Sequence, residues 1–317
     1  MRKIVLIATL FFVSCNNNTK ILLASSGNLN EISVVVEDQL WEGSVGKALT
    51  NILSKPIYGL PQQEPLFKLR QIPPRVFSGF VTKSRTIIII ERNKQKHTRL
   101  LLNKYASPQT VIVVSGMTSG EIISELKKYS SKIINTIKSA EIKEKQRRIR
   151  KSLSNSQVLD SMFKIKLDFP SIYRVAAAER GFVWLRKDTK SGSVNLTIFQ
   201  TPLKTNSLNT EKIITIRDSV SKQKIPGPAQ GTYMSTETQY KSVLKSTKIS
   251  KYKGLEVRGL WEVKKQFMGG PFINFSIVDS INNRILFFDG FVYSPATKKA
   301  SYIFEIEAII KSLKFLK

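Results

Sequence analysis

The first half of the chain alternates short runs of β-branched residues with stretches of helical periodicity. Runs of about four to eight such residues, bounded by turn formers, predict strands. This pattern predicts strands at residues 32–36, 66–69, 86–90, 97–102 and 110–114. After the first strand, apolar residues at helical spacing predict a helix that starts near Leu40 and ends before Pro56.

The clearest helical pattern follows the last of these strands. Thr118 and Glu121 fit a capping box, in which both side chains satisfy free backbone N–H groups at a helix start. The apolar stripe of this helix consists of Ile122, Leu126, Tyr129, Ile133, Ile137 and Ala140. The helix is expected to continue into a basic segment at residues 143–151, where the first of two domains ends.

The second half has the pattern of an antiparallel sheet. Alternating and β-branched runs predict strands at residues 163–169, 173–178, 182–186, 194–199, 255–263, 272–278 and 285–293. Asn282 and Asn283 are suited to a hairpin turn between the last two strands.

Two helices complete the second half. Apolar spacing predicts them at residues 211–220 and 298–317, the latter closing the chain. The predicted fold class is therefore α+β. It comprises an N-terminal α/β domain at residues 31–152, which ends in the long basic helix, and an antiparallel domain with a C-terminal helix at residues 153–317.

The N-terminus predicts export. Residues 1–14 have the basic start and the apolar run of a signal peptide. The only cysteine, Cys15, stands where cleavage is expected, and this layout resembles a bacterial lipoprotein signal in which the cysteine is lipidated. Residues 15–30 would then be a lipidated tether. A plain secretory signal with an incidental cysteine is the alternative; a spanning helix would need about 20 apolar residues.

Charge bears on the partners. The chain carries 51 Lys and Arg against 23 Asp and Glu, a formal net charge of +28. Such a surface attracts anions. Export argues against nucleic acid, so the bilayer, anionic envelope components or another envelope protein are the expected partners, and solvated surface charge is the alternative. The candidate anion-binding residues at the basic helix end are Lys143, Lys145, Arg147, Arg148, Arg150 and Lys151. A solvated helix face that links two domains is the other interpretation of this segment.

Few residues suggest catalysis. His97 is the only histidine, and a hydrolase triad would have to use it, but its surroundings predict a surface residue. One histidine and one cysteine leave no recognisable zinc site and no intrachain disulfide. Glu37 and Asp38 follow a strand and are the best carboxylate pair, although adjacent residues on a strand point in opposite directions. No cofactor and no metal are expected.

One local sequence of the second half is unusual: Met268, Gly269, Gly270, Pro271 and Phe272. Its two glycines allow positive φ angles or a close approach of another backbone. We interpret the segment as a bend or bulge between strands. A ligand-facing loop is the alternative interpretation.

Several motifs are spread over nearly the whole chain. They lie at residues 26–31, 34–46, 61–67, 225–228, 233–234, 261–262, 268–272, 293–296 and 307–315. Together they resemble a family of Bacteroidota envelope lipoproteins classified as a domain of unknown function. The resemblance implies an envelope lipoprotein, with no catalytic residues to transfer. The second half is also similar to the Mog1/PsbP/DcrB-like fold, whose members commonly act as accessory or binding proteins.

These observations predict a membrane-anchored envelope lipoprotein that binds or scaffolds another envelope component without catalysis. The alternative is a carboxylate-dependent hydrolase or glycan-processing enzyme of the periplasm. Residues 16–20 lack an acidic cluster of the kind that resembles a surface-export signal. We therefore expect a periplasm-facing location at the outer membrane.

Overall fold

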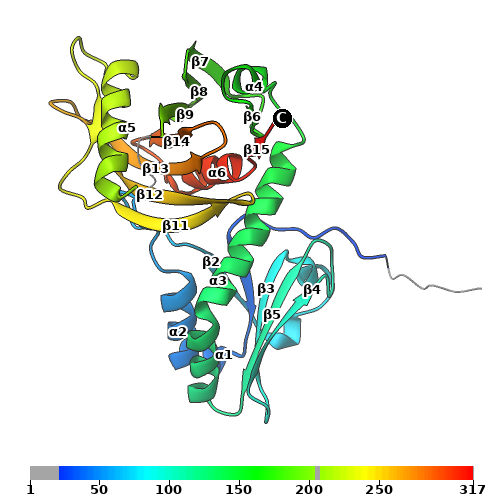
Figure 1. Ribbon diagram of the computed structural model, residues 1–317. Helices are drawn as coiled ribbons and strands as arrows, with labels where there is room; N and C mark the ends of the chain where they lie inside the picture. Colours follow the sequence, from blue (N-terminus) through cyan, green and yellow to red (C-terminus); the bar gives the residue numbers. More distant parts are fainter. Residues whose placement is uncertain (1–20, 204–207, 317) are drawn as a thin grey trace, which may run out of the picture.

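The computed structural model describes residues 21–203 and 208–316 (Figure 1). Two main sheets lie in different parts of the molecule, and one long helix runs from one to the other. Cys15 and the signal peptide expected at residues 1–14 lie outside the described residues, so their roles stay predictions.

The β-branched runs of the first half form a five-stranded sheet. Its strands are β1 (Glu31–Val35), β2 (Lys68–Ile72), β3 (Thr86–Arg92), β4 (His97–Leu102) and β5 (Thr110–Gly116). They lie in the order β2-β1-β3-β5-β4. The first four strands of this order run parallel to one another, and β4 is antiparallel to β5 at the edge.

Helices cover one face of this sheet and two short 3-10 helices lie at the other. The covering segments are α1 (Asp38–Glu42), α2 (Ser44–Leu53), α3 (Ser119–Ile149), η1 (Pro74–Val76) and η2 (Gly79–Lys83). The parallel strands are buried on both faces, which explains their nearly continuous apolar sequence.

The helix predicted after the first strand is in fact two helices, which meet at Gly43. A Cβ atom at Gly46 would lie 1.7 Å from the carbonyl oxygen of Trp41. Because only glycine fits there, the first turn of α2 can pack directly against the end of α1. The periodicity indicated the helical content but not this break.

The second half forms an eight-stranded sheet. Seven strands lie in the order β10-β12-β13-β14-β9-β8-β7, and β11 pairs with β12. Their bounds are β7 (Arg174–Glu179), β8 (Phe182–Thr189), β9 (Gly192–Pro202), β10 (Met234–Thr236), β11 (Val243–Ile249), β12 (Tyr252–Val263), β13 (Met268–Asp279) and β14 (Arg284–Tyr293). All described pairings within this sheet are antiparallel, and the predicted hairpin joins β13 to β14.

One helix packs on each face of this sheet. Along β13, Ile273 and Phe275 face the core beneath α6 (Ala300–Ile310), whereas Phe272 faces the core beneath α5 (Thr210–Lys224). A short helix, α4 (Gln157–Phe163), precedes the sheet. The predicted α+β class and the C-terminal helix are confirmed.

Two predicted elements near the domain ends differ from the structure. The strand expected at residues 163–169 is only the two-residue β6 (Ile165–Lys166), because α4 ends at Phe163 and Lys164 adopts a left-handed conformation with φ of 54°. The helix expected at residues 298–317 ends at Ile310. The chain then forms β15 (Lys314–Phe315), which pairs with β6 and so uses backbone groups that a longer helix would have consumed.

Two segments join the domains. The first half of α3 packs on the five-stranded sheet, and its second half places Ile142 and Ile149 in the core beneath α6. The segment between α2 and β2 also reaches the second domain. There, Glu64 accepts hydrogen bonds from the backbone N–H groups of Lys299 (2.6 Å) and Ala300 (3.1 Å), which have no partner within α6 because they lie at its start.

Part of the segment expected to be a tether belongs to the folded domain. Ser26 donates its backbone N–H to the carbonyl of Lys83 (2.9 Å), and Ser25 donates to the carbonyl of Ser107 (3.1 Å). These bonds attach the chain to the N-terminal domain well before residue 31, because neighbouring loops offer free backbone carbonyls there.

Candidate functional site

Ion pairs connect α3 to two carboxylates on α6. Lys138 Nζ lies 2.8 Å from Glu307 Oε1, and Lys145 Nζ lies 2.6 Å from Glu305 Oε2. Glu305 also accepts hydrogen bonds from Lys187 and from the Tyr173 hydroxyl. Burial by itself would raise the pKa of Glu305, but Lys145 and Lys187 outweigh it and lower the pKa.

Glu307 is the centre of a cluster of cations. Its side chain is 2% exposed and lies within 3.0 Å of the nitrogens of Lys138, Arg258 and Lys311. Burial would raise the pKa of Glu307, but the three cations hold it well below its usual range. Arg258 is shared with Glu256, whose Oε1 lies 2.6 Å from its Nε.

A cleft of about 1590 Å³ opens beside this cluster. Its walls come from α3, from the segment after α2, and from the β11–β12 ribbon. Eight basic side chains and two carboxylates line it. Both carboxylates, Glu256 and Glu307, are already engaged by the ion pairs of the cluster, so the cleft has an excess of positive charge.

Five lysines that line the cleft have no ion-pair partner among the described residues: three that face one another across it, and Lys248 and Lys253 farther along the β11–β12 ribbon. Among the described residues, Lys55, Lys143 and Lys245 have no carboxylate within ion-pair distance, and all three are exposed at the cleft. Lys55 and Lys143 come from the N-terminal side and Lys245 from β11, so the two domains face each other across the cleft with like charge. Like charges in such an arrangement attract an anion between them.

Polar and apolar groups accompany these lysines. Ser131, Asn135 and Ser139 follow one another along the face of α3 that lines the cleft, and Tyr58 and Ile57 lie at its edge. Hydroxyl and amide groups suit an oxygen-rich ligand. The site can therefore hold an anion by several lysine contacts while polar side chains bind its neutral oxygens.

The cleft continues around the β11–β12 ribbon. Lys248 and Lys253 line this part and are cross-strand neighbours. Sequence reasoning missed Lys55 and the ribbon lysines. The one available clue was the density of lysine at residues 241–253, but nothing in the sequence places that hairpin opposite α3.

Four members of the basic helix end have carboxylate partners. Arg147 and Arg148 both bind Glu144 at 2.7 Å, Lys145 binds Glu305, and Arg150 Nε lies 3.0 Å from Asp168. Burial raises the pKa of Glu144, but the hydrogen bonds from Arg147 and Arg148 lower it to about 2. The six basic residues therefore do not form one free patch. Within the described chain, Lys143 and Lys151 alone among them have no ion-pair partner.

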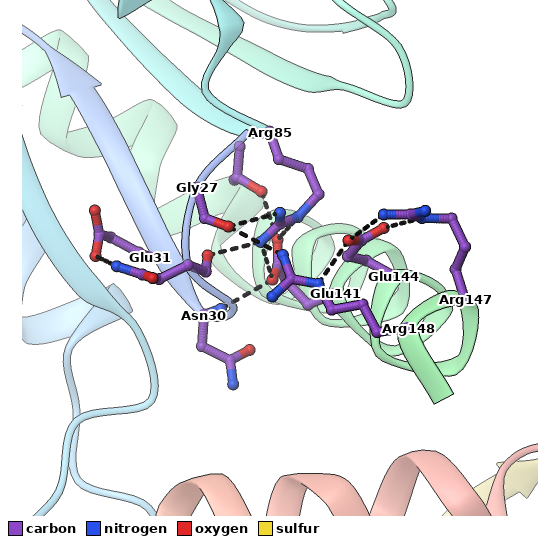
Figure 2. A network of polar contacts seen from close by, with 10 residues as sticks. Gly27, Asn30, Glu31, Arg85, Glu141, Glu144, Arg147 and Arg148 are labelled. Carbon is purple, nitrogen blue, oxygen red and sulfur yellow. Dashed lines mark hydrogen bonds and ion pairs between the residues drawn. The ribbon is translucent and has the colours of Figure 1, made fainter. Parts of the chain in front are cut away.

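Figure 2 shows how the same stretch of α3 binds the segment from Gly27 to Asn30. The guanidinium of Arg85 donates to both carboxylate oxygens of Glu141 at 3.0 Å, and it also donates to the carbonyl of Gly27. Asn30 donates its backbone N–H to Glu141 (2.9 Å). Glu141 is fully buried and fully paired, so this network has a structural role.

The segment Met268–Phe272 is not a ligand-facing loop. Its residues form the start of β13, paired with β12 on one side, and Phe272 is buried. A Cβ at Gly270 would lie 2.1 Å from the carbonyl oxygen of Val292, and one at Gly269 would lie 2.8 Å from that of Trp261. The glycines are required by close approach of neighbouring strands, which corrects the ligand-loop interpretation.

The other chemical candidates lie outside the cleft. Asp38 accepts a hydrogen bond from Gln71 at 2.8 Å, and both Asp38 and Glu37 are exposed beyond the end of β1. His97 lies on β4, where its Nδ1 is 2.8 Å from the hydroxyl of Ser115. Ser115 is buried and donates to the backbone carbonyl of Gln95, which is a structural contact.

A second buried polar cluster fixes α5 to the sheet. Arg217 is 0% exposed, its Nε lies 2.9 Å from Asp289 Oδ1, and its guanidinium stacks on Phe272 at 4.0 Å from the ring centre. Asn274 donates to the same carboxylate oxygen at 3.0 Å. Burial raises the pKa of Asp289 and outweighs the opposing effect of Arg217 and Asn274.

The described residues contain neither a metal-binding cluster nor a membrane-spanning helix. No group of three or more His, Cys, Asp or Glu side chains is arranged to hold a metal ion. No helix in this part of the chain combines the length and apolarity needed to cross a membrane.

The fold and the cleft together define a two-domain α+β protein with a basic interdomain cleft. Residues 152–312 match the family model described as "Domain of unknown function (DUF4837)", and the chain belongs to that family. Residues 25–150 match the model described as "Domain of unknown function (DUF8532)". The two matches meet at the end of α3.

Two solved structures resemble part of this chain, both at low sequence identity. A crystal structure from Bacteroides thetaiotaomicron VPI-5482 is 11% identical over 49% of this chain and 46% of that chain, with a TM-score of 0.28. This chain thus spans about half the length of that protein. The human StarD13 (DLC2) lipid transfer and protein localization domain is 7% identical over 45% of this chain and 90% of that chain, with a TM-score of 0.22. No curated protein matches.

Proposed function

We propose that this protein is a membrane-anchored lipoprotein of the cell envelope that binds an anionic envelope component in its interdomain cleft. The observation that carries the proposal is the cleft itself, where Lys55, Lys143 and Lys245 face one space without carboxylate partners. The ligand class is an oxygen-rich anion, such as a phosphate-bearing headgroup or an acidic glycan. The protein acts by binding rather than by catalysis.

The anchoring part of the proposal comes from the sequence. The basic start, the apolar run and Cys15 have the layout of a lipoprotein signal, and the motif pattern resembles Bacteroidota envelope lipoproteins. Lipid attached to Cys15 would hold the protein at a membrane surface, on the periplasmic side of the outer membrane. Its body would then meet anionic headgroups and glycans at high local concentration.

Electrostatics favours binding over catalysis in the cleft. General acid–base chemistry with carboxylates needs at least one group that exchanges a proton near neutral pH. Glu307 instead has its pKa lowered by three cations, which keeps it ionised. Exposed lysines that are not neutralised give a salt-sensitive attraction, which suits reversible binding of an anion.

The anchoring is tested by replacing Cys15. In cells, Cys15→Ser should abolish incorporation of labelled fatty acid and release the protein into the soluble periplasmic fraction. Protease added to intact cells should not digest the wild-type protein. Fatty-acid labelling of the Cys15→Ser variant, or digestion of the wild-type protein in intact cells, contradicts the respective part of the proposal.

The binding is tested with two triple variants of equal charge. K55Q/K143Q/K245Q removes the three free lysines that face one another across the cleft, and K94Q/K127Q/K132Q removes exposed lysines that do not line it. Calorimetric titration would use glycerol phosphate headgroups, an oligosaccharide of uronic acids, and a neutral oligosaccharide. The cleft variant should lose at least about tenfold in affinity for the anion that binds, because three contacts near 1 kcal/mol each are removed.

The control variant should bind within about twofold of wild type. The phosphate and uronate arms identify which anion the cleft prefers, and the neutral sugar measures the contribution of the hydroxyl groups. Equal affinities for the two triple variants would show that net charge, rather than the cleft, attracts the anion, and would refute the proposal.

A further inference from the structure

The surface where the chain enters the fold exposes apolar side chains. Leu23 is 59% exposed, Val76 on η1 is 51% exposed, and Phe80 on η2 is 73% exposed. Single exposed apolar side chains are common on protein surfaces, whereas several of them close together indicate an interaction site. We call Leu23, Val76, Phe80, Lys83 and Lys104 the entry surface.

Backbone hydrogen bonds attach the entering chain to the loops that carry these residues. Ser107 donates to the carbonyl of Leu23 (2.9 Å), and Ser26 donates to the carbonyl of Lys83 (2.9 Å). The ammonium of Lys83 lies 5.9 Å from the centre of the Phe80 ring.

Two more ring contacts complete the entry surface. Phe77, next to Val76, packs edge-on against Tyr105 at 5.5 Å between ring centres. Lys104 Nζ lies 5.0 Å from the centre of the same Tyr105 ring. The surface thus combines apolar groups with lysines around the point where the chain enters the domain.

The number of residues between Cys15 and Leu23 limits how far the entry surface can lie from a lipid on Cys15. Cys15 and Leu23 are separated by eight Cα–Cα steps (23 − 15), which span at most about 29 Å when fully extended. A domain assembly of this size has a radius of gyration near 19 Å and therefore a diameter of about 50 Å. A tether shorter than the protein's diameter keeps the side on which it enters toward the bilayer.

We propose that the entry surface rests on an anionic phospholipid bilayer, with Phe80, Val76 and Leu23 among the headgroups and Lys83 and Lys104 at the lipid phosphates. This inference rests on the proposed lipid anchor for its geometry, but it concerns a different surface from the cleft. Apolar groups beside lysines complement a negatively charged interface. A short lipid tether then fixes the orientation of the body as well as its location.

The chain offers a matched control at the other domain. Phe267 is fully exposed in the turn between β12 and β13, and it follows Lys264 and Lys265. It therefore presents the same residue types without proximity to the chain entry. The proposal assigns bilayer contact to Phe80 and excludes it for Phe267.

The test uses the mature chain with Cys15→Ser, which has no other cysteine. An environment-sensitive dye is attached at Val76→Cys, beside Phe80, or at Gln266→Cys, beside Phe267. Vesicles contain phosphatidylglycerol in neutral lipid, with and without quencher on the acyl chains. The dye at 76 should shift to shorter wavelength and be quenched, whereas the dye at 266 should not respond.

Partition into the same vesicles measures the contribution of each aromatic ring. Phe80→Ser should lower the partition coefficient roughly tenfold, and Phe267→Ser should leave it within about twofold. K83Q/K104Q should flatten the dependence of partition on salt. Equal responses at both dye positions, or no vesicle-dependent response at either, would overturn the proposal, and a dye shift that depends on protein concentration without vesicles would assign the surface to a second copy of the chain.

The result is separable from the function proposed above. In the cleft variant K55Q/K143Q/K245Q, the dye at position 76 should still shift and be quenched on vesicles, whatever the cleft contributes to the affinity. Loss of the dye response in a protein that still requires Cys15 for membrane fractionation would refute the entry surface and leave the anchor standing.

Discussion

Replacing Glu307 with glutamine should destabilise the protein strongly and in a pH-dependent way. Glu307 is the carboxylate that Lys138, Arg258 and Lys311 share, and it is 2% exposed. Glutamine keeps the shape of the side chain but leaves three cations around a neutral amide. Removing one partner of a buried ion pair lowers the free energy of unfolding by about 3–5 kcal/mol.

The exposure of the cations places the cost at the lower end of that range. Lys138 and Lys311 retain 25% and 22% exposure, so water screens part of their repulsion. We expect a loss of about 3 kcal/mol in the free energy of unfolding. A domain of 150–250 residues shifts by about 2–4 °C per kcal/mol, so the melting temperature should fall by about 6–12 °C at pH 7.

The sign of the pH dependence follows from the lowered pKa. A carboxyl group whose pKa is lower in the folded state than its usual 4.5 stabilises the fold fully above that value. This contribution is lost as the pH falls below 4.5 toward the folded pKa. The difference in melting temperature between wild type and E307Q should therefore stay constant from pH 8 to about pH 5 and shrink at lower pH.

Differential scanning calorimetry from pH 3 to pH 8 measures this difference directly. Carboxyl groups outside the cluster are unaffected by the substitution, so the difference reports on Glu307 and on the groups that share its cations. Glu42→Gln, at an exposed site on α1, should stay within about 0.5 kcal/mol of wild type. A loss below 1 kcal/mol at pH 7, or a difference that does not change down to pH 3, would refute the reasoning.

Three further substitutions test structural roles. Glu64→Gln removes the anionic cap of α6 and should cost about 1–2 kcal/mol in urea unfolding. Gly270→Ala forces a Cβ to within 2.1 Å of a carbonyl oxygen and should cost about 3 kcal/mol or more, while Gly120→Ala, with no atom closer than 3.8 Å, should be neutral or slightly stabilising by the same assay. Asp289→Asn leaves Arg217 with only the partly exposed Asp218, 3.2 Å away, as an ion-pair partner and should cost about 3 kcal/mol in thermal unfolding, most of which the double variant R217M/D289L should recover.

Local patterns in the sequence determined much of the fold. β-Branched runs become buried parallel strands wherever both faces are covered, and their order along the chain fixed the α/β character of the first domain. The capping box predicted the start of α3, where Glu121 donates its N–H to the Thr118 hydroxyl at 3.2 Å. The long hairpin of β13 and β14 followed from the two apolar runs and the asparagine turn between them.

Short elements and charge partners were beyond the reach of such patterns. β6 and β15 are two residues each and form because they pair with each other, although Lys166 and Lys314 are 148 positions apart in the chain (314 − 166). The basic end of α3 looked uncompensated because only Glu144 opposes it locally. Its other carboxylates, Asp168 and Glu305, come from the second domain.

What the sequence determined by itself is therefore local: strand and helix identity, the positive charge, and the expectation of a lipid-anchored N-terminus. The interdomain cleft was decided only by tertiary structure, because Lys55, Lys143 and Lys245 meet through the path of α3 and the docking of the segment around Glu64. Whether a lysine is neutralised depends on which carboxylates the fold brings within about 4 Å. That distance is set by packing between domains and leaves no trace in the local pattern of residues.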